Sequence, residues 1–142
     1  MDRDEMLKNV PIFSELEPNA LSSLGELMTP RSFRAGDAIV TENDQPVGFF
    51  IIVSGRVEVV RGADGSAPQS LATLGPGEFF GEMALFEGYP RSATVRALED
   101  TECLVLPRWH FTGELHSHPE IAVGVIKVLV RRLRDTEARL SE

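Results

Sequence analysis

The stretch GPGEFFGEMALFEGYPRSATVRA, residues 75–97, is the part of this chain around which the rest is organised. Two turn signals, Gly-Pro-Gly at 75–77 and Gly-Tyr-Pro at 88–90, bracket a short apolar segment. That segment has room for about one or two helical turns, and Gly81 at its start lets a ligand or another backbone approach closely. Arg91 and Ser92 follow the second turn. The unpaired amides of a helix start, an Arg fork and a hydroxyl together predict a site for a phosphate group.

The same residues also fit a β-hairpin whose surface loop pairs Arg91 with Glu82 or Glu87. Residue chemistry alone does not separate the two interpretations, but the order of the residues does. Phe-Gly-Glu-Met-Ala-Leu at 80–85, a short loop and Pro-Arg-Ser-Ala-Thr-Val at 90–95 resemble the phosphate-binding cassette of the cyclic-nucleotide-binding domain family. This is the domain of bacterial catabolite activator proteins, of cAMP-dependent kinase regulatory subunits and of cyclic-nucleotide-gated channels.

The resemblance implies a role for each matching position. Glu82 matches the carboxylate that accepts a hydrogen bond from the ribose 2′-OH, and Arg91 matches the residue that pairs with the cyclic phosphate. One Arg and the helix-start amides can offset the single charge of a ring phosphate without a metal ion. The rest of the phosphate cradle is expected from Gly81, Met83, Ala84, Leu85, Ser92 and Ala93. The apolar positions around the sugar and the base are expected at Val59, Leu71 and Phe80.

The resemblance leaves the readout of the base open between cAMP and cGMP. In the catabolite-activator branch a Thr-Ser pair of the last helix contacts the purine; here Thr136 matches the Thr, but Glu137 replaces the Ser. In some channel domains an Arg of this helix caps the base, and Arg132 matches it. Ser92 offers a donor to a guanine held in the syn conformation. We therefore expect binding of cAMP or cGMP, with Arg132 and Thr136 as the contacts from the last helix.

The rest of the chain predicts a mainly β, α+β fold in one domain, 1–142. Its parts are N-terminal helices over 1–30, a β-barrel over 31–107 and C-terminal helices over 108–142. Short strand candidates separated by turn residues predict a sandwich or barrel. The resemblance implies an eight-stranded antiparallel jelly-roll barrel with a short helix in the cassette and a long C-terminal helix. The strand candidates are Arg31–Arg34, Ala38–Thr41, Gly48–Val53, Val57–Arg61, Ser70–Leu74, Ala93–Leu98 and Glu102–Leu106.

The last helix, from about Glu120 to Leu140, is predicted to carry two apolar stripes at about 100° per residue. We expect the first stripe to cover the barrel mouth and the second to pair with a second copy of the chain in a homodimer. One wide core-facing stripe in a monomer is the alternative. The first stripe is Ile121, Val125, Val128 and Arg132, and the second is Ala122, Ile126, Leu129, Leu133, Thr136 and Leu140.

Composition excludes several classes of function. The formal net charge of -8 makes the chain a poor binder of nucleic acid and of anionic membrane surfaces. Cys103, the single cysteine, cannot form an internal disulfide or a zinc site alone. With no apolar signal region at the N-terminus, we expect a cytoplasmic protein. His116-Ser117-His118 resembles part of a cupin metal motif but lacks the remaining ligands, so we expect no metal and no catalytic site.

The leading hypothesis is a noncatalytic cyclic-nucleotide sensor that relays occupancy through its last helix. One alternative is the N-terminal sensor half of a catabolite-activator-like transcription regulator, because Arg131-Arg132-Leu133 with Thr136-Glu137 resembles the hinge helix of such proteins. The sequence ends before a DNA-binding domain, so no nucleic-acid binding is expected from this chain. A barrel that has lost its ligand and serves as an interaction module is the other alternative.

Overall fold

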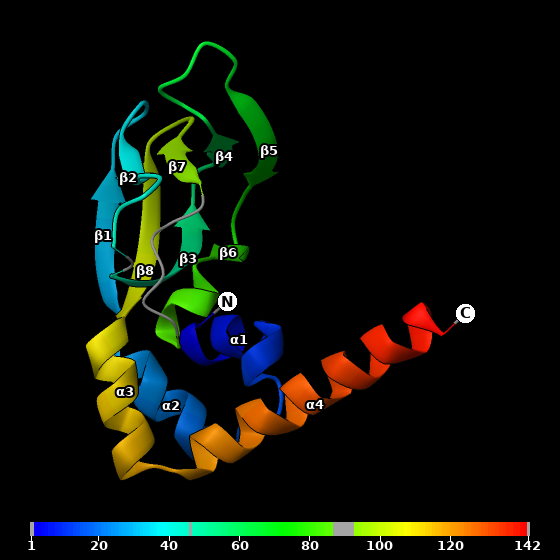
Figure 1. Cartoon of the computed structure of the whole chain (residues 1–142). Helices are drawn as coiled ribbons and strands as arrows, with labels where there is room; N and C mark the ends of the chain where they lie inside the picture. Colours follow the sequence, from blue (N-terminus) through cyan, green and yellow to red (C-terminus); the bar gives the residue numbers. More distant parts are fainter. Residues whose placement is uncertain (1, 46, 87–92, 142) are drawn as a thin grey trace. The chain divides into compact units, whose positions relative to one another are not determined.

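Short runs of apolar and β-branched residues form strands wherever a turn residue lets the chain reverse (Figure 1). The structure is a computed structural model that describes residues 2–45, 47–86 and 93–141. In its described part, the barrel unit Met28–Trp109 contains eight strands. They are β1 (Thr29–Phe33), β2 (Ala38–Val40), β3 (Gly48–Ser54), β4 (Val57–Arg61), β5 (Gln69–Leu74), β6 (Phe79–Phe80), β7 (Thr94–Ala97) and β8 (Thr101–Pro107).

The strands form two four-stranded antiparallel sheets, in the orders β1-β8-β3-β6 and β2-β7-β4-β5. Strands distant in the sequence are neighbours in both sheets, as the Greek-key connections of a jelly roll require. Phe50 pairs with Val105 in the first sheet, and Val59 pairs with Val95 in the second. The predicted eight-stranded antiparallel jelly roll is therefore confirmed.

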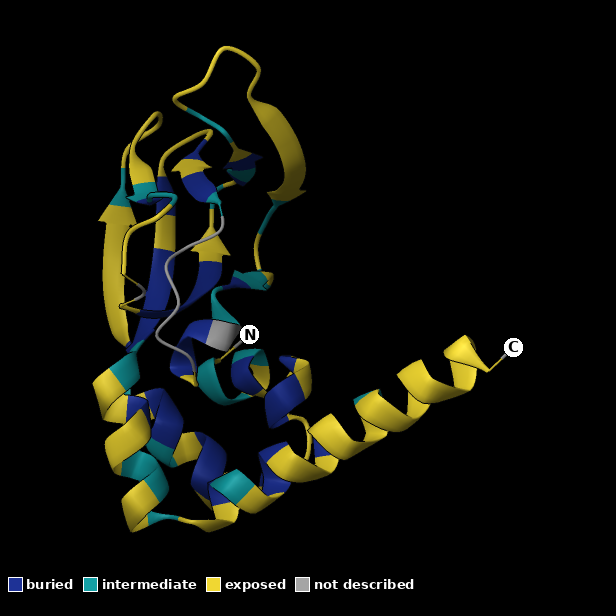
Figure 2. Cartoon of the chain, in the orientation of Figure 1, coloured by how far each residue is buried: buried dark blue, intermediate teal, exposed yellow. Residues whose placement is uncertain are grey.

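One apolar core lies between the two sheets, because alternate side chains of each strand point inward. Its buried members come from both sheets: Val40, Phe50, Ile52, Val57, Phe80, Val95, Cys103 and Val105. β3 is buried on both faces over residues 48–52, whereas β5 is an exposed edge strand (Figure 2). The second sheet therefore has an open, exposed edge along β5.

The helical unit, Met1–Leu27 with His110–Glu142, contains short N-terminal helices and a long final one. Asp2 caps the first helix, because its Oδ1 accepts a hydrogen bond from the amide of Glu5 at 2.8 Å. The second helix begins at Pro18, where the missing N–H of proline costs nothing. The helical elements are α1 (Arg3–Lys8), the 3-10 turn η1 (Pro11–Phe13), α2 (Pro18–Leu27), α3 (Arg108–Ser117) and α4 (Glu120–Leu140).

Most expected strands differ from the observed ones by one residue at an end, and two differences are larger. β6 was not among the expected strands, since a two-residue strand is too short to show a period. β1 starts at Thr29 and includes Pro30, which was expected in the helical segment; β1 is an edge strand, where a residue without an N–H is tolerated. α4 begins at Glu120 and ends at Leu140, as expected, with Pro119 at its N-cap position and no side-chain cap.

Candidate functional site

The turn at residues 75–78 fixes the start of the candidate site on β3. The amide of Gly77 donates to the carbonyl of Ile52 at 2.8 Å, and the amide of Ile52 donates to the carbonyl of Glu78 at 2.9 Å. Gly77 has a φ of +83°, which glycine adopts without strain. The Oε1 atom of Glu78 accepts from the amide of Gly75 at 3.0 Å. The first turn signal of the quoted stretch is thus a closed turn that delivers β6 to the sheet.

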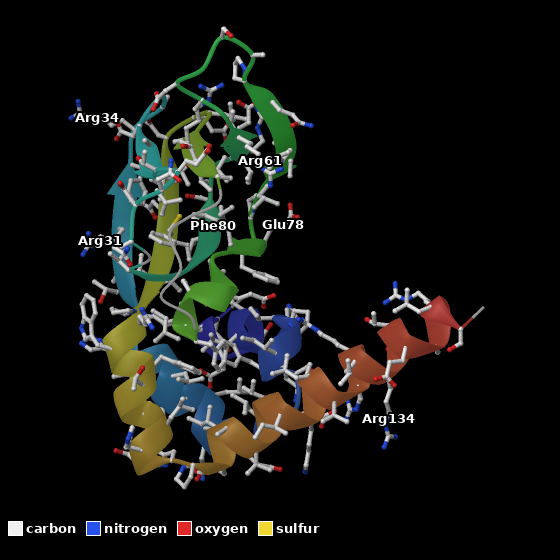
Figure 3. All side chains as sticks on the ribbon, viewed as in Figure 1. Arg31, Arg34, Arg61, Glu78, Phe80 and Arg134 are labelled. Carbon is white, nitrogen blue, oxygen red and sulfur yellow. The ribbon has the colours of Figure 1, made fainter. Side chains whose placement is uncertain are left out.

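Phe80 anchors the candidate site in the barrel core. Its ring stacks on that of Phe50, with centroids 4.8 Å apart and an interplanar angle of 7°. Phe79 points to the other side of the sheet and meets Phe49 edge to face at 5.7 Å. Figure 3 labels Phe80 and Glu78 beside β3. Phe80 was expected beside the sugar and base; the structure shows a ring that is largely committed to the core.

The chain leaves the core through Gly81 and turns at once into a short 3-10 helix. Gly81 has a φ of +82°, a conformation that glycine adopts without strain, and the close approach predicted at this residue stays a prediction. The 3-10 helix η2 runs over Glu82–Leu85 and packs on β3, with Ala84 and Leu85 buried. The amide of Ala84 donates to the carbonyl of Gly81 at 3.0 Å. The predicted short helix is therefore present, and one of its expected cradle amides serves the turn itself.

Glu82 stands at the first position of η2 and is half-buried, with its Oε2 atom buried. A carboxylate held in this way would interact more strongly with a ligand hydroxyl than one in bulk water, because water competes less. The geometry therefore fits the acceptor role that the resemblance implies for Glu82.

The remaining cassette positions divide between described and undescribed residues. Arg91 and Ser92 lie outside the described residues, and of Met83 only the backbone is described. Ala93 is half-buried and directly precedes β7. The predicted phosphate contacts of these residues stay predictions.

Val59 and Leu71 lie on the β4–β5 hairpin, in different surroundings. Val59 is half-buried against the core and pairs with Val95 on one side and with Ala72 on the other. The register shifts between Val59 and Val60, which faces Ser70, so Leu71 is the extra residue of a β-bulge. Leu71 is 41% exposed on the open edge. The structure thus packs Val59 against the core beside β7 and leaves Leu71 at the solvent.

Arg132 and Thr136 lie one turn apart on α4, in the helical unit. Arg132 is half-buried and Thr136 is exposed. The hydroxyl of Thr136 donates to the carbonyl of Arg132 at 2.8 Å, a common bond within a helix. Their predicted contact with a base stays a prediction.

The first stripe of α4 packs within its own unit. Ile121, Val125 and Val128 are buried, and α4 contacts η1. Gly124 permits this approach, since a Cβ there would lie 2.7 Å from Cδ2 of Leu16. Within the helical unit this stripe therefore packs on the N-terminal segment. The predicted cover of the barrel mouth stays a prediction.

The second stripe of α4 is exposed, as Figure 2 shows for the second half of the helix. Its large apolar side chains range from 43% exposed at Leu129 to 80% at Leu140. An isolated exposed leucine needs no explanation, but a contiguous row along one helix marks an interaction surface. The members of this row are Ile126, Leu129, Leu133 and Leu140.

Glu42 is a residue of this region that the sequence analysis did not single out. Its amide donates to the hydroxyl oxygen of Thr94 at 3.0 Å, and its Oε1 atom accepts from the amide of Gly62 at 2.8 Å. It therefore touches both β7 and the loop of the β4–β5 hairpin. The sequence around it, Thr-Glu-Asn-Asp, carries only the signal of a turn.

Metal, membrane and thiol chemistry receive no support from the described residues. No group of three or more His, Cys, Asp or Glu side chains within 2–45, 47–86 and 93–141 could hold a metal ion. In the same ranges, no helix combines the length and the apolar character that a membrane crossing requires. Burial raises the pKa of the Cys103 thiol to about 11, so this group is a neutral core side chain at ordinary pH.

Comparison with known proteins places these features in a family. The family model for the cyclic nucleotide-binding domain, a binding domain and not a catalytic one, matches residues 30–118. The chain is 30% identical over 98% of its length to a CRP-like cAMP-activated global transcriptional regulator of Mycobacterium tuberculosis, and 34% identical over 94% to the cyclic AMP receptor protein of Thermus thermophilus. It spans 62% of the length of each of these curated relatives.

A solved structure gives the same result for the fold. The N-terminal domain of a transcriptional regulator from Streptomyces coelicolor A3(2) superposes with a TM-score of 0.85 at 30% identity, over 95% of this chain and 94% of that one. Its match covers both the jelly roll and the flanking helices. The chain therefore belongs to the cyclic nucleotide-binding domain family.

Proposed function

We propose that this chain is a noncatalytic cyclic-nucleotide sensor that binds cAMP, with cGMP as the weaker ligand. The observation that carries the proposal is the arrangement at residues 80–85: a core-anchored Phe80, a tight turn at Gly81 and the buried Oε2 atom of Glu82 at the start of η2. These elements support the proposal because they follow the residue order of the family cassette. The two curated relatives are both named for cAMP.

In this proposal Glu82 accepts from the ribose 2′-OH, and Arg91 forms a bidentate pair with the cyclic phosphate. Amides of η2 with Ser92 and Ala93 complete the cradle, and Val59 lies beside the sugar and base. Arg132 or Thr136 supplies the contact to the base. Thr136 matches the first hydroxyl of the catabolite-activator pair, but Glu137 replaces the second, so the pair itself does not decide between the two bases. The preference for cAMP therefore rests on the relatives.

The output in this proposal is α4. Its exposed row of Ile126, Leu129, Leu133 and Leu140 pairs with the same row of a second copy, because two such helices would bury their apolar surface in a coiled coil. A ligand moves such a helix only by its differential affinity for the two states. Contact of a nucleotide with α4 would supply that difference. A cytoplasmic location is part of the proposal.

A second candidate role is favoured by the Streptomyces structure. That protein is the N-terminal domain of a transcriptional regulator, and this chain matches 94% of it. The sensor would then be the ligand-binding half of such a regulator. This role shares the ligand and the helix with the first and differs only in the output.

Isothermal titration calorimetry with cAMP and with cGMP tests the proposal, on the wild-type chain and on Arg91→Ala. We expect saturable binding, tighter for cAMP, and a loss of about 10- to 100-fold in affinity for Arg91→Ala, because a charge-assisted pair contributes about 1.5–3 kcal/mol. Arg31→Ala is a matched control, since it removes an exposed Arg of β1, at the opposite edge of its sheet from β6. No heat and no thermal stabilisation with either nucleotide at millimolar concentration would refute the proposal.

A further inference from the structure

The turn after β2 sets the position of Glu42. The amide of Asp44 donates to the carbonyl of Thr41 at 3.1 Å, which closes a four-residue turn with Glu42 at its second position. Asn43, at the third position, has a φ of +74° and is the one non-glycine residue with a positive φ among the described residues. Asparagine tolerates this conformation better than most residues. The turn therefore holds the backbone of Glu42 in a defined orientation.

From this turn Glu42 reaches two elements of the second sheet. Its amide is bound to Oγ1 of Thr94, a side chain that is 7% exposed, at the first residue of β7. Its Oε1 atom is bound to the amide of Gly62, which follows Arg61 at the end of β4 and opens the β4–β5 loop. Figure 3 labels Arg61 at this end of the strand. The second bond is charge-assisted and 2.8 Å long, so it is the stronger of the two.

β4 is paired with β7 up to the pair Val60–Thr94, and the two bonds of Glu42 add a connection from Thr94 to Gly62, beyond the end of this ladder. β7 directly follows Ala93, a residue of the expected phosphate cradle, and the β4–β5 hairpin carries Val59 and Leu71, the expected neighbours of the sugar and base. The hairpin has an open edge along β5, so the sheet holds it from one side only. A bond from Glu42 to Gly62 therefore supplies a restraint that the strand ladder does not.

We propose that Glu42 is a positioning residue for nucleotide binding, which holds the loop end of the β4–β5 hairpin beside the start of β7. This inference rests on the proposed function. Glu42 touches no ligand in this role; it reduces the freedom that the hairpin would otherwise lose when a nucleotide binds. Preorganisation of this kind raises affinity without adding a ligand contact.

Calorimetry with cAMP on the full chain tests this role with three variants. Glu42→Ala removes the acceptor, and we expect about fivefold to tenfold weaker binding, the equivalent of one lost hydrogen bond. Glu42→Gln keeps an oxygen acceptor for the amide of Gly62, and we expect it to stay within about threefold of wild type, because only the charge is lost. Glu99→Ala also removes one carboxylate charge, in this case from the exposed ion pair with Arg56, and this variant should bind cAMP as tightly as wild type does.

A second pair of variants keeps the test decisive if Glu42→Ala folds poorly. Thr94→Val removes the hydroxyl that receives the amide of Glu42 at nearly constant side-chain volume, and Thr94→Ser retains it. In the nucleotide-free chain, amide hydrogen exchange at Gly62 should accelerate in Thr94→Val and in Glu42→Ala, and stay as in wild type in Thr94→Ser and Glu42→Gln. This readout reports the connection itself, independently of ligand.

The outcomes separate the two levels of the proposal. A wild-type chain that binds cAMP, with Glu42→Ala binding equally well, overturns the positioning role and leaves the sensor intact. Equal loss of affinity in Glu42→Ala and Glu42→Gln also overturns it, because the acceptor would not be the cause. A wild-type chain that binds neither nucleotide refutes the sensor, and the positioning role with it.

Discussion

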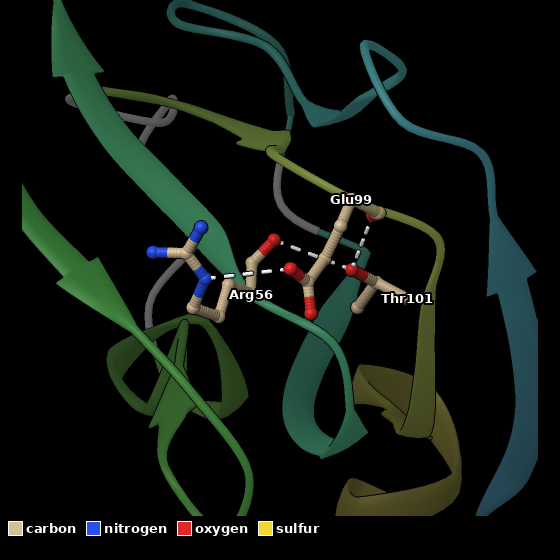
Figure 4. A network of polar contacts seen from close by, with 3 residues as sticks. All are labelled: Arg56, Glu99 and Thr101. Atoms are coloured by element: carbon tan, nitrogen blue, oxygen red, sulfur yellow. Dashed lines mark hydrogen bonds and ion pairs between the residues drawn. The ribbon is translucent and has the colours of Figure 1, made fainter.

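Gly55 offers a sharp test of how the barrel is closed at the β3–β4 turn. It has a φ of +94°, and a Cβ placed there would lie 2.4 Å from Oγ1 of Thr101 and 2.6 Å from the carbonyl oxygen of Asp100. Figure 4 shows the network behind this turn, in which Thr101 donates to the carbonyls of Glu99 at 2.8 Å and of Arg56 at 3.3 Å. The turn cannot move away from a new methyl group without breaking these bonds.

The expected magnitude follows from two separate costs. A positive φ costs an L-residue about 1–2 kcal/mol, and forcing a methyl group into a packed contact costs about 1–3 kcal/mol more. Gly55→Ala should therefore lower the free energy of unfolding by about 2–5 kcal/mol. Gly36→Ala is the matched control, because Gly36 has a φ of +92° with nothing within 4 Å of the added Cβ. That variant should lose only the first cost.

Urea denaturation of both variants at neutral pH measures the difference. The two changes alter the unfolded chain in the same way, so this contribution cancels when they are compared. We expect Gly55→Ala to be less stable than Gly36→Ala by about 1–3 kcal/mol, with similar slopes of unfolding free energy against urea. Equal losses in the two variants would show that the close packing of the β3–β4 turn on β8 is not real.

Three further predictions concern the thiol, an ion pair and the last helix. Burial raises the pKa of Cys103 from 9.0 to about 11, so the folded chain should resist thiol reagents at pH 8 but react with them in urea. Its free energy of unfolding should fall as the pH rises from 9.0 toward 11, because in this range the thiol ionises readily only in the unfolded chain. Arg131 lies 2.5 Å from Glu15 and lowers the pKa of that carboxyl. The stability from this pair is therefore present above pH 4.5 and is lost as the pH falls through the lowered pKa. Arg131→Gln should remove this contribution to the fall of the urea midpoint at acid pH. Leu133→Glu should shift the chain toward monomer in sedimentation velocity, while Arg134→Glu should not, and equal behaviour of the two would exclude this face as the dimer contact.

Much of the fold could be predicted because its signals are local. The strands follow from short β-prone runs between turn residues, and the short helix η2 lies between the two turn signals that predicted it. β6 could not be predicted as a strand, since its two residues become a strand only by pairing with Phe50 and Ile51 of β3. Local sequence does not encode that partner.

Some residues of the candidate site could likewise be predicted from the local sequence, and others depend on contacts between distant segments. The cassette order led to Glu82, and the structure adds that its Oε2 atom is buried. The bulge that exposes Leu71 depends on the register of β4 against β5, which no sequence period fixes. Glu42 acts through contacts to Thr94 and Gly62, 52 and 20 residues away in the chain, so nothing near it in the sequence marks it.

The central claim is that a cyclic nucleotide binds at the segment 80–85 and β7. Amide hydrogen exchange of the full chain, measured by mass spectrometry with and without saturating cAMP, tests it most directly. The account predicts slower exchange in peptides that cover 79–86 and 93–97, because bound nucleotide would occupy the amides of η2 and restrain the start of β7. Peptides of β1, at the opposite edge of the sheet from β6, should be unchanged. Binding that leaves 79–86 unprotected, or protects only other parts of the barrel, would contradict the account.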